Sequence, residues 1–208
     1  MHLVVTTGSA RGRETPVLVA GGGPAGLAAA AELASRGIRC VVIEPRAQVS
    51  HRRPRAKTTS VRTMEHLRRW GIAETLRAAA PLPVAWSQRV TFCESLSGRR
   101  ITDFDGAFGL VTGRDERFAE AGQQVPQPVV EEVLRTHVRG QAGVDLRLGH
   151  AVTSLDQRDD AVTVTVRDAS GAGYQVTATL PLSSLPAAGQ AAAAAQQEPA
   201  VHVPESAA

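Results

Sequence analysis

Three consecutive glycines separate an apolar run from an alanine-rich run in the stretch VLVAGGGPAGLAAAAELASRGIRCVVIEPR, Val17 to Arg46. Glycine loses more conformational entropy on ordering than any other residue, so such a cluster indicates that bare main chain is needed there. Gly21, Gly23 and Gly26 have the spacing GxGxxG. We expect the first to permit a tight turn, the second to let a pyrophosphate approach the backbone, and the third to let a helix pack closely on a sheet.

An acidic residue, Glu44, ends the next apolar run, about 20 residues further along the chain. A carboxylate at that strand end can accept hydrogen bonds from two ribose hydroxyls and would repel a 2′-phosphate. The predicted site therefore prefers FAD or NAD to NADP. Pro24 and Ala25 fall in the first turn of the helix, whose N–H groups and dipole would face the diphosphate. The alternative is a plain glycine turn with Glu44 on the surface.

The elements that would position these residues form a βαβ unit. Pro16–Ala20 is apolar throughout, as expected for a strand covered on both faces. The segment LAAAAELASR (27–36) is typical of a helix, and Gly37 lies where a left-handed glycine would end it. Arg39–Glu44 is a second apolar strand. The predicted fold class is α/β, a Rossmann-like domain with a parallel sheet and crossover helices.

The rest of the folded region is predicted to contain two more helices, a hairpin and a β-meander. Ser60 can cap one helix, and another amphipathic helix follows Pro128, with His137 as an ordinary residue of its face. Turn residues separate short alternating segments downstream. The predicted strands are 87–94 and 99–104 for the hairpin, and 151–156, 161–167 and 174–179 for the meander.

Composition disfavours several function classes. The chain has 208 residues, 43% hydrophobic but only 3% aromatic, which provides little for stacking single-stranded nucleic acid. The basic cluster HRRPRAK (51–57) is compatible with a solvated loop or a phosphate-bearing cofactor, and least with nucleic acid, because no recognition motif accompanies it. The two cysteines and six histidines show no metal-ligand spacing, so we predict no metal site. No run approaches a membrane span or a signal-peptide core, so a cytoplasmic location is expected.

Longer motifs, in a fixed order, resemble the FAD-dependent aromatic hydroxylases. These are GGGPAGL with Glu44, PRAKTTSVRTMEHLRRWGI at 54–72, and QVPQPVVEEVLRTHV at 124–138. The resemblance is to single-component flavoprotein monooxygenases similar to para-hydroxybenzoate, phenol and polyketide hydroxylases, and it covers about residues 16–180. It implies FAD as cofactor, NAD(P)H as electron donor and a small aromatic substrate, which is hydroxylated with oxygen.

The resemblance also implies further cofactor contacts. Arg46 would reach the adenosine half, Arg55 would contact the flavin, Gln127 would reach the middle of the cofactor, and the backbone of Val152 would lie near adenine. No catalytic residue is predicted. The predicted cofactor-binding residues are Gly21, Gly23, Pro24, Ala25, Gly26, Glu44, Arg46, Arg55, Gln127 and Val152.

The family pattern stops at about Leu180, before the Asp-Gly and Gly-Asp motifs that the resemblance implies. We therefore expect a truncated chain whose substrate domain is largely missing, either a working enzyme or a remnant. The expected divisions are a flexible extension (1–15), an incomplete FAD-binding domain (16–180) and a disordered tail rich in Ala, Pro and Gln (181–208). Two other functions stay open: an NAD-linked Rossmann oxidoreductase and a non-catalytic nucleotide-binding module.

Overall fold

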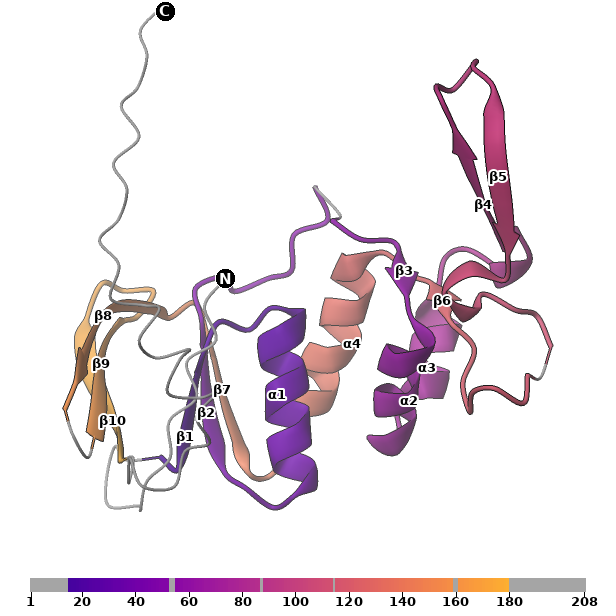
Figure 1. Cartoon of the computed structure of the whole chain (residues 1–208). Coiled ribbons are helices and arrows are strands. Elements are labelled where there is room, and N and C mark those ends of the chain that lie inside the picture. Colours follow the sequence, from indigo (N-terminus) through magenta and orange to yellow (C-terminus); the bar gives the residue numbers. More distant parts are fainter. Residues whose placement is uncertain (1–14, 53–54, 87, 114, 159–160, 180–208) are drawn as a thin grey trace, which may run out of the picture.

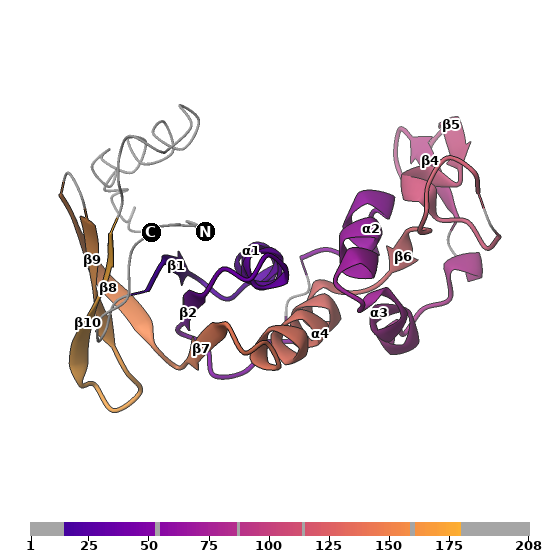
Figure 2. The same cartoon turned by 90° about the horizontal axis from the view of Figure 1, so that it is seen from below.

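Layers of secondary structure are stacked side by side along the protein (Figure 2). The computed structural model describes residues 15–52, 55–86, 88–113, 115–158 and 161–179. A three-stranded antiparallel sheet packs on a three-stranded parallel sheet, and two helices, α1 and α4, cover the other face of the parallel sheet. Two shorter helices and a projecting hairpin lie beyond them (Figure 1).

The parallel sheet has the order β1-β2-β7, formed by β1 (Val17–Ala20), β2 (Cys40–Glu44) and β7 (Val144–Leu148). The β1–α1–β2 part confirms the predicted βαβ unit. The third strand was not predicted, because Asp145 and Arg147 interrupt its apolar residues. In the structure these two side chains pair with each other, with 2.7 Å between Nη2 and Oδ2.

The crossover helices are α1 (Pro24–Ser35) and α4 (Gln127–Arg139). Both pack on the same side of the sheet, where Leu27 and Ala30 of α1 and Val138 of α4 are completely buried. Gly37, with a φ of 72°, ends α1 as predicted. Small side chains on α1 let the two helices lie close together over the sheet.

The other face of the parallel sheet packs on the predicted β-meander, which the structure confirms. The meander consists of β8 (Ala151–Gln157), β9 (Ala161–Arg167) and β10 (Gly173–Thr179), in the order β10-β9-β8. Leu18 of β1 lies in this interface, whereas its neighbours Val17 and Val19 face the helices. Because both faces are covered, every residue of the strand must be apolar.

The remaining elements lie at the far end of the molecule (Figure 1). Ser60 caps α2 by accepting a hydrogen bond from the Thr63 N–H at 3.4 Å, as predicted. The helix α3, the short β3–β6 pair and two 3-10 turns were not predicted. These elements are β3 (Thr58–Thr59), α2 (Val61–Arg69), α3 (Ala73–Ala79), η1 (Val84–Trp86), β4 (Arg89–Cys93), β5 (Arg100–Asp105), η2 (Ala107–Gly109) and β6 (Gln123–Gln124).

The predicted hairpin is the antiparallel pair β4–β5, which projects from the body (Figure 1). Phe92 and Phe104 form an edge-to-face pair with ring centroids 5.7 Å apart. They are nevertheless 52% and 54% exposed. The hairpin therefore presents aromatic surface to solvent.

The predicted divisions of the chain stay predictions, because both terminal segments lie largely beyond the part that the structure describes. Residues 1–14 and 180–208, which include nearly all of the predicted extension and the whole predicted tail, lie outside the described residues. Thr15 is buried, and its N–H donates to the Thr177 carbonyl at 3.3 Å. Cys40 of β2 is buried, and burial raises the pKa of its thiol to about 11. Within the described ranges, no helix is long and apolar enough to cross a membrane.

The interface between the two sheets can be tested with matched leucine substitutions. Leu18 is 1% exposed between the sheets, whereas Leu155 of β8 is 41% exposed. We expect Leu18→Ala to lower the free energy of unfolding by about 2–5 kcal/mol, and Leu155→Ala to change it by less than about 1 kcal/mol. Urea denaturation measures both, and equal losses would contradict the packing of the meander on the parallel sheet.

Candidate dinucleotide-binding site

A tight turn of glycines joins β1 to α1 at the carboxyl end of the parallel sheet. Gly21 has a φ of 108°, a backbone conformation that favours glycine. Its N–H donates to the Ile43 carbonyl of β2 at 2.8 Å. The turn is thereby attached to the neighbouring strand directly before Glu44.

Gly26 lies where the first turn of α1 crosses this glycine turn. A Cβ atom there would lie 1.9 Å from the Gly21 carbonyl oxygen and 3.2 Å from Cγ1 of Val19. No side chain fits at these distances, so glycine is required for α1 to start close to the end of β1. This geometry agrees with the packing role expected for Gly26.

The beginning of α1 has no side-chain cap. Gly23 is the N-cap residue, with φ and ψ of −79° and −178°, and the first turn contains no acidic residue. These angles are open to any residue, so the backbone conformation does not require glycine at this position. A bare N-cap instead leaves the first N–H groups of the helix accessible to an anion, which the helix dipole favours.

Glu44 ends β2 and faces the glycine turn. Its side chain is almost completely buried, with 4% of its surface exposed, so it is not the surface residue of the alternative interpretation. Oε2 accepts a hydrogen bond from the Gly22 N–H at 2.7 Å. Oε1 accepts from the backbone N–H of Arg46 at 3.0 Å and from its Nε at 2.6 Å. Burial opposes ionisation of this carboxyl, but the hydrogen bonds from Arg46 and Gly22 outweigh it and lower its pKa.

Gly22, which is not among the predicted cofactor-binding residues, also contacts Glu44. Besides its hydrogen bond to Glu44, a Cβ atom at this position would lie only 2.8 Å from the Glu44 Cβ. The middle glycine therefore lets the turn approach the acidic side chain. In the sequence, the only indication of this role is the position of Gly22 between Gly21 and Gly23.

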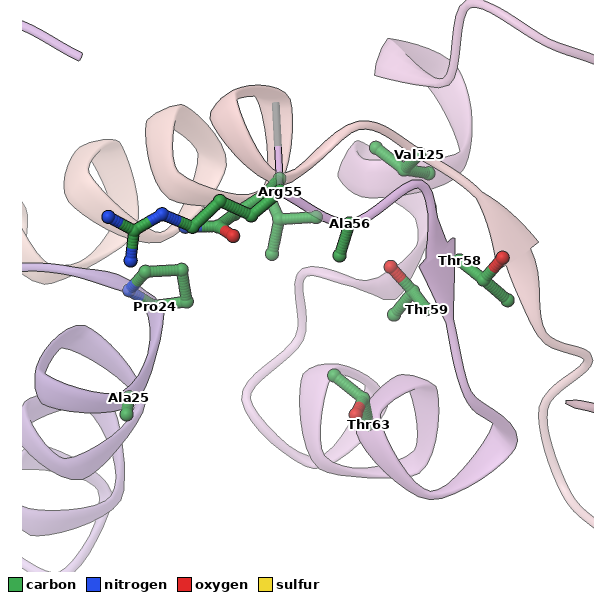
Figure 3. Close-up of a pocket in the computed structure, with 10 residues that line it drawn as sticks. Pro24, Ala25, Arg55, Ala56, Thr58, Thr59, Thr63 and Val125 are labelled. Carbon is green, nitrogen blue, oxygen red and sulfur yellow. The ribbon is translucent and has the colours of Figure 1, made fainter. Parts of the chain in front are cut away.

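A pocket of about 340 Å³ opens on the other side of the start of α1. Pro24, Ala25, Arg55 and Gln127 all line it, and Figure 3 shows the Arg55 side chain extending toward Pro24. The N–H of Gln127 donates to the Ala56 carbonyl at 2.8 Å, so the start of α4 is attached to the loop that carries Arg55. The structure thus brings four of the predicted residues together around one cavity.

Val152 lies apart from this pocket. It pairs with Val166 in the meander, and its side chain packs against the core between the sheets. Nearby, the His150 N–H donates to the Glu44 carbonyl at 3.1 Å, which places the start of β8 beside the end of β2. The contact of the Val152 backbone with adenine stays a prediction.

The glycine turn and the pocket both adjoin Pro24 and Ala25, at the start of α1. On one side lie the glycine turn, Glu44 and Arg46, which suit a diphosphate and a ribose. On the other side lies the pocket with Arg55 and Gln127. This geometry fits a dinucleotide extended across the start of α1.

Comparison with known proteins decides the family. A family model described as "FAD binding domain" matches residues 14–181. The chain belongs to this family. The aklavinone 12-hydroxylase DnrF of Streptomyces peucetius is 33% identical over 166 residues, covering 79% of this chain and 33% of that protein. The 2,4-dichlorophenol 6-monooxygenase of Delftia acidovorans is 33% identical over 159 residues, covering 74% and 26%.

Solved structures give the same result. The flavin-dependent monooxygenase PieE, in complex with FAD and substrate, superposes with a TM-score of 0.67 at 30% identity, over 79% of this chain and 29% of that one. The chain thus spans about a third of the length of the relatives it matches. Membership of the FAD-binding family favours the predicted hydroxylase relationship over an NAD-linked oxidoreductase or a non-catalytic module.

The close approach of helix and turn can be tested at Gly26. We expect Gly26→Ala to lower the free energy of unfolding by about 1–3 kcal/mol or more, because its methyl group meets the Gly21 carbonyl. Gly113→Ala is the control, since a Cβ there has nothing within 4 Å. Thermal denaturation compares the two variants, and an unaffected Gly26→Ala protein would contradict the geometry of the turn.

The hydrogen bonds of Glu44 predict a pH dependence of stability. Its folded-state pKa lies below the ordinary 4.5, so its stabilising contribution is present above that pH and is lost as the pH falls through the lowered value. We expect Glu44→Gln to be less stable than the parent by about 1–3 kcal/mol near pH 7, with the difference narrowing in acid. Urea denaturation between neutral and acid pH measures this, and a difference independent of pH would be inconsistent with an ionised, hydrogen-bonded Glu44.

Proposed function

We propose that this chain binds FAD and forms the cofactor-binding part of a monooxygenase that hydroxylates a small aromatic substrate with NAD(P)H and O2. The observation that carries the proposal is the uncapped start of α1 directly after a glycine turn that is hydrogen-bonded to the buried carboxylate of Glu44, in a chain of the FAD-binding family. The start of α1 suits a diphosphate, and Glu44 suits the adenosine ribose that is joined to it in FAD. A cytoplasmic location, where NAD(P)H is supplied, fits this activity.

Each part of the site has a defined task in this proposal. The bare N–H groups at Gly23 and Ala25 bind the diphosphate, and Gly23 provides the space for it. Glu44 accepts hydrogen bonds from the ribose hydroxyls and disfavours a 2′-phosphate. Arg55 offers a planar, permanently charged fork to phosphate or flavin oxygens, and Gln127 offers both a donor and an acceptor to the middle of the cofactor.

The redox chemistry belongs to the cofactor, which supplies electrons from NAD(P)H to oxygen, while the protein binds and orients it. The names of the relatives support an aromatic substrate, since one of them acts on 2,4-dichlorophenol. The match covers only 33% of DnrF and 26% of the 2,4-dichlorophenol 6-monooxygenase, so the residues that select their substrates need not lie within it.

Titration of the purified chain with FAD, followed by flavin fluorescence, tests the proposal. We expect saturable binding of FAD, and weaker binding of NADP⁺ because of Glu44. Glu44→Ala should weaken FAD binding by about 10- to 100-fold, as expected for the loss of hydrogen bonds to a charged group. Gly23→Val should abolish it, because the side chain would occupy the place of the diphosphate.

Glu74→Ala is the matched control. Glu74 is an exposed acid on α3 that pairs with Arg77 and does not line the pocket. We expect Glu74→Ala to remove the same charge and leave FAD binding unchanged. A folded parent that does not bind FAD would overturn the proposal, as would unchanged binding in both site variants. Oxidation of NADPH or NADH stimulated by a phenol would then show whether the chain has hydroxylase-type activity.

A further inference from the structure

Glu44 and Arg46 form a charged network with two residues of α4. The Arg46 guanidinium bridges two carboxylates, with its Nε 2.6 Å from Glu44 Oε1 and its Nη2 2.7 Å from Glu131 Oε1. Arg135, one turn after Glu131 on α4, lies 3.2 Å from the same Glu131 oxygen and 3.8 Å from Glu44 Oε1. We call these four residues the α4 network. Its two positive and two negative charges balance.

The burial of the α4 network is unusual for such residues. Glu131 and Arg135 are only 2% and 5% exposed, although a Glu–Arg pair at this helical spacing normally faces water. Burying two charges is costly unless they are paired and hydrogen-bonded, and replacing such a pair with apolar residues is often neutral for stability. Stability alone therefore does not account for the buried Glu131–Arg135 pair. The contact of Glu131 with Arg46 needs another explanation.

The Arg135 guanidinium also fixes the backbone after β2. Its Nη1 donates to the carbonyl oxygens of Arg46 and Ala47, at 3.4 Å each. Arg46 is thereby held at both ends: α4 binds its main chain through Arg135 and its guanidinium through Glu131. Its side chain is nevertheless 43% exposed, so it borders the open side of the site.

Glu44 has little acceptor capacity left for a ribose. Oε1 already accepts two hydrogen bonds from Arg46, and Oε2 accepts one from Gly22. If two ribose hydroxyls are to bind, the Arg46 Nε has to leave Oε1. Glu131 can keep the guanidinium in place through Nη2 while this happens, and Arg135 balances the charge of Glu131.

We propose that Glu131, supported by Arg135, is a positioning residue for nucleotide binding: it holds Arg46 beside the adenosine half of FAD while Glu44 turns to the ribose. This inference rests on the proposed function. Glu131 does not itself touch the cofactor and acts only through Arg46. Without Glu131, Glu44 is the only carboxylate of the network left to Arg46, which then competes with the ribose.

A double-mutant cycle on the full chain tests the inference. FAD dissociation constants are measured for the parent, Glu131→Gln, Arg46→Ala and the double variant. We expect Glu131→Gln to weaken FAD binding about three- to tenfold in the parent and to have no effect in the Arg46→Ala background. Glu132→Gln, the same change at the adjacent exposed residue, should leave binding unchanged, because Glu132 pairs with His51 instead.

The outcomes separate this inference from the proposed function. If the parent does not bind FAD, the proposed function fails and the inference with it. If the parent binds FAD and Glu131→Gln weakens binding equally in both backgrounds, Glu131 is only structural and the inference alone is overturned. If Glu131→Gln fails to fold, the uncharged pair Glu131→Gln/Arg135→Met replaces it in the same cycle, with the same expected loss of effect when Arg46 is absent.

Discussion

The hydrogen bond from the Gly22 N–H to the Glu44 carboxylate is the contact on which the rest of the site depends. It joins the turn after β1 to the end of β2 across a distance of 2.7 Å. It requires a residue without a side chain on one partner and a buried, ionised carboxylate on the other. The same turn leads directly into the uncapped start of α1, where the proposed function places the diphosphate next to the ribose at Glu44.

The layers of the fold explain why this contact forms at the sheet edge. The β1 and β2 strands are covered by helices on one face and by the meander on the other, so polar chemistry is confined to the places where the strands end. Glu44 is the last residue of β2 and the first polar side chain after an apolar run. The α4 network then extends from that point along the helix, through Arg46 to Glu131 and Arg135.

Much of this arrangement could be predicted from the sequence, because its signals are local. An apolar strand, glycines at a fixed spacing, Gly37 after a helix and an acid at the next strand end each follow from backbone conformation or burial. The meander was predictable because its residues alternate with a period of two. The β7 strand was not predicted because Asp145 and Arg147 alternate with its apolar residues, so it lacks the continuous apolar run that marks β1 and β2 of the same parallel sheet.

The buried α4 network could not be predicted, because a Glu and an Arg four residues apart on a helix usually indicate a solvent-exposed ion pair. Glu131 and Arg135 are spaced like an ordinary solvent-facing pair, and only the packing of α4 against the end of β2 turns them inward. Gly22 was overlooked for a related reason: its role depends on where Glu44 lies in space. Local patterns thus predict which elements form, whereas contacts between charges on separate elements emerge only from their packing.

Amide chemical shifts recorded during titration with FAD test the central claim most directly. If the glycine turn and Glu44 bind the adenosine diphosphate, the amides of Gly22, Gly23, Ala25 and Gly26 should shift most, together with those of Glu44 and Arg46. Amides in the projecting β4–β5 hairpin should stay unchanged. Saturable FAD binding that leaves the turn unchanged and shifts amides elsewhere would contradict the account.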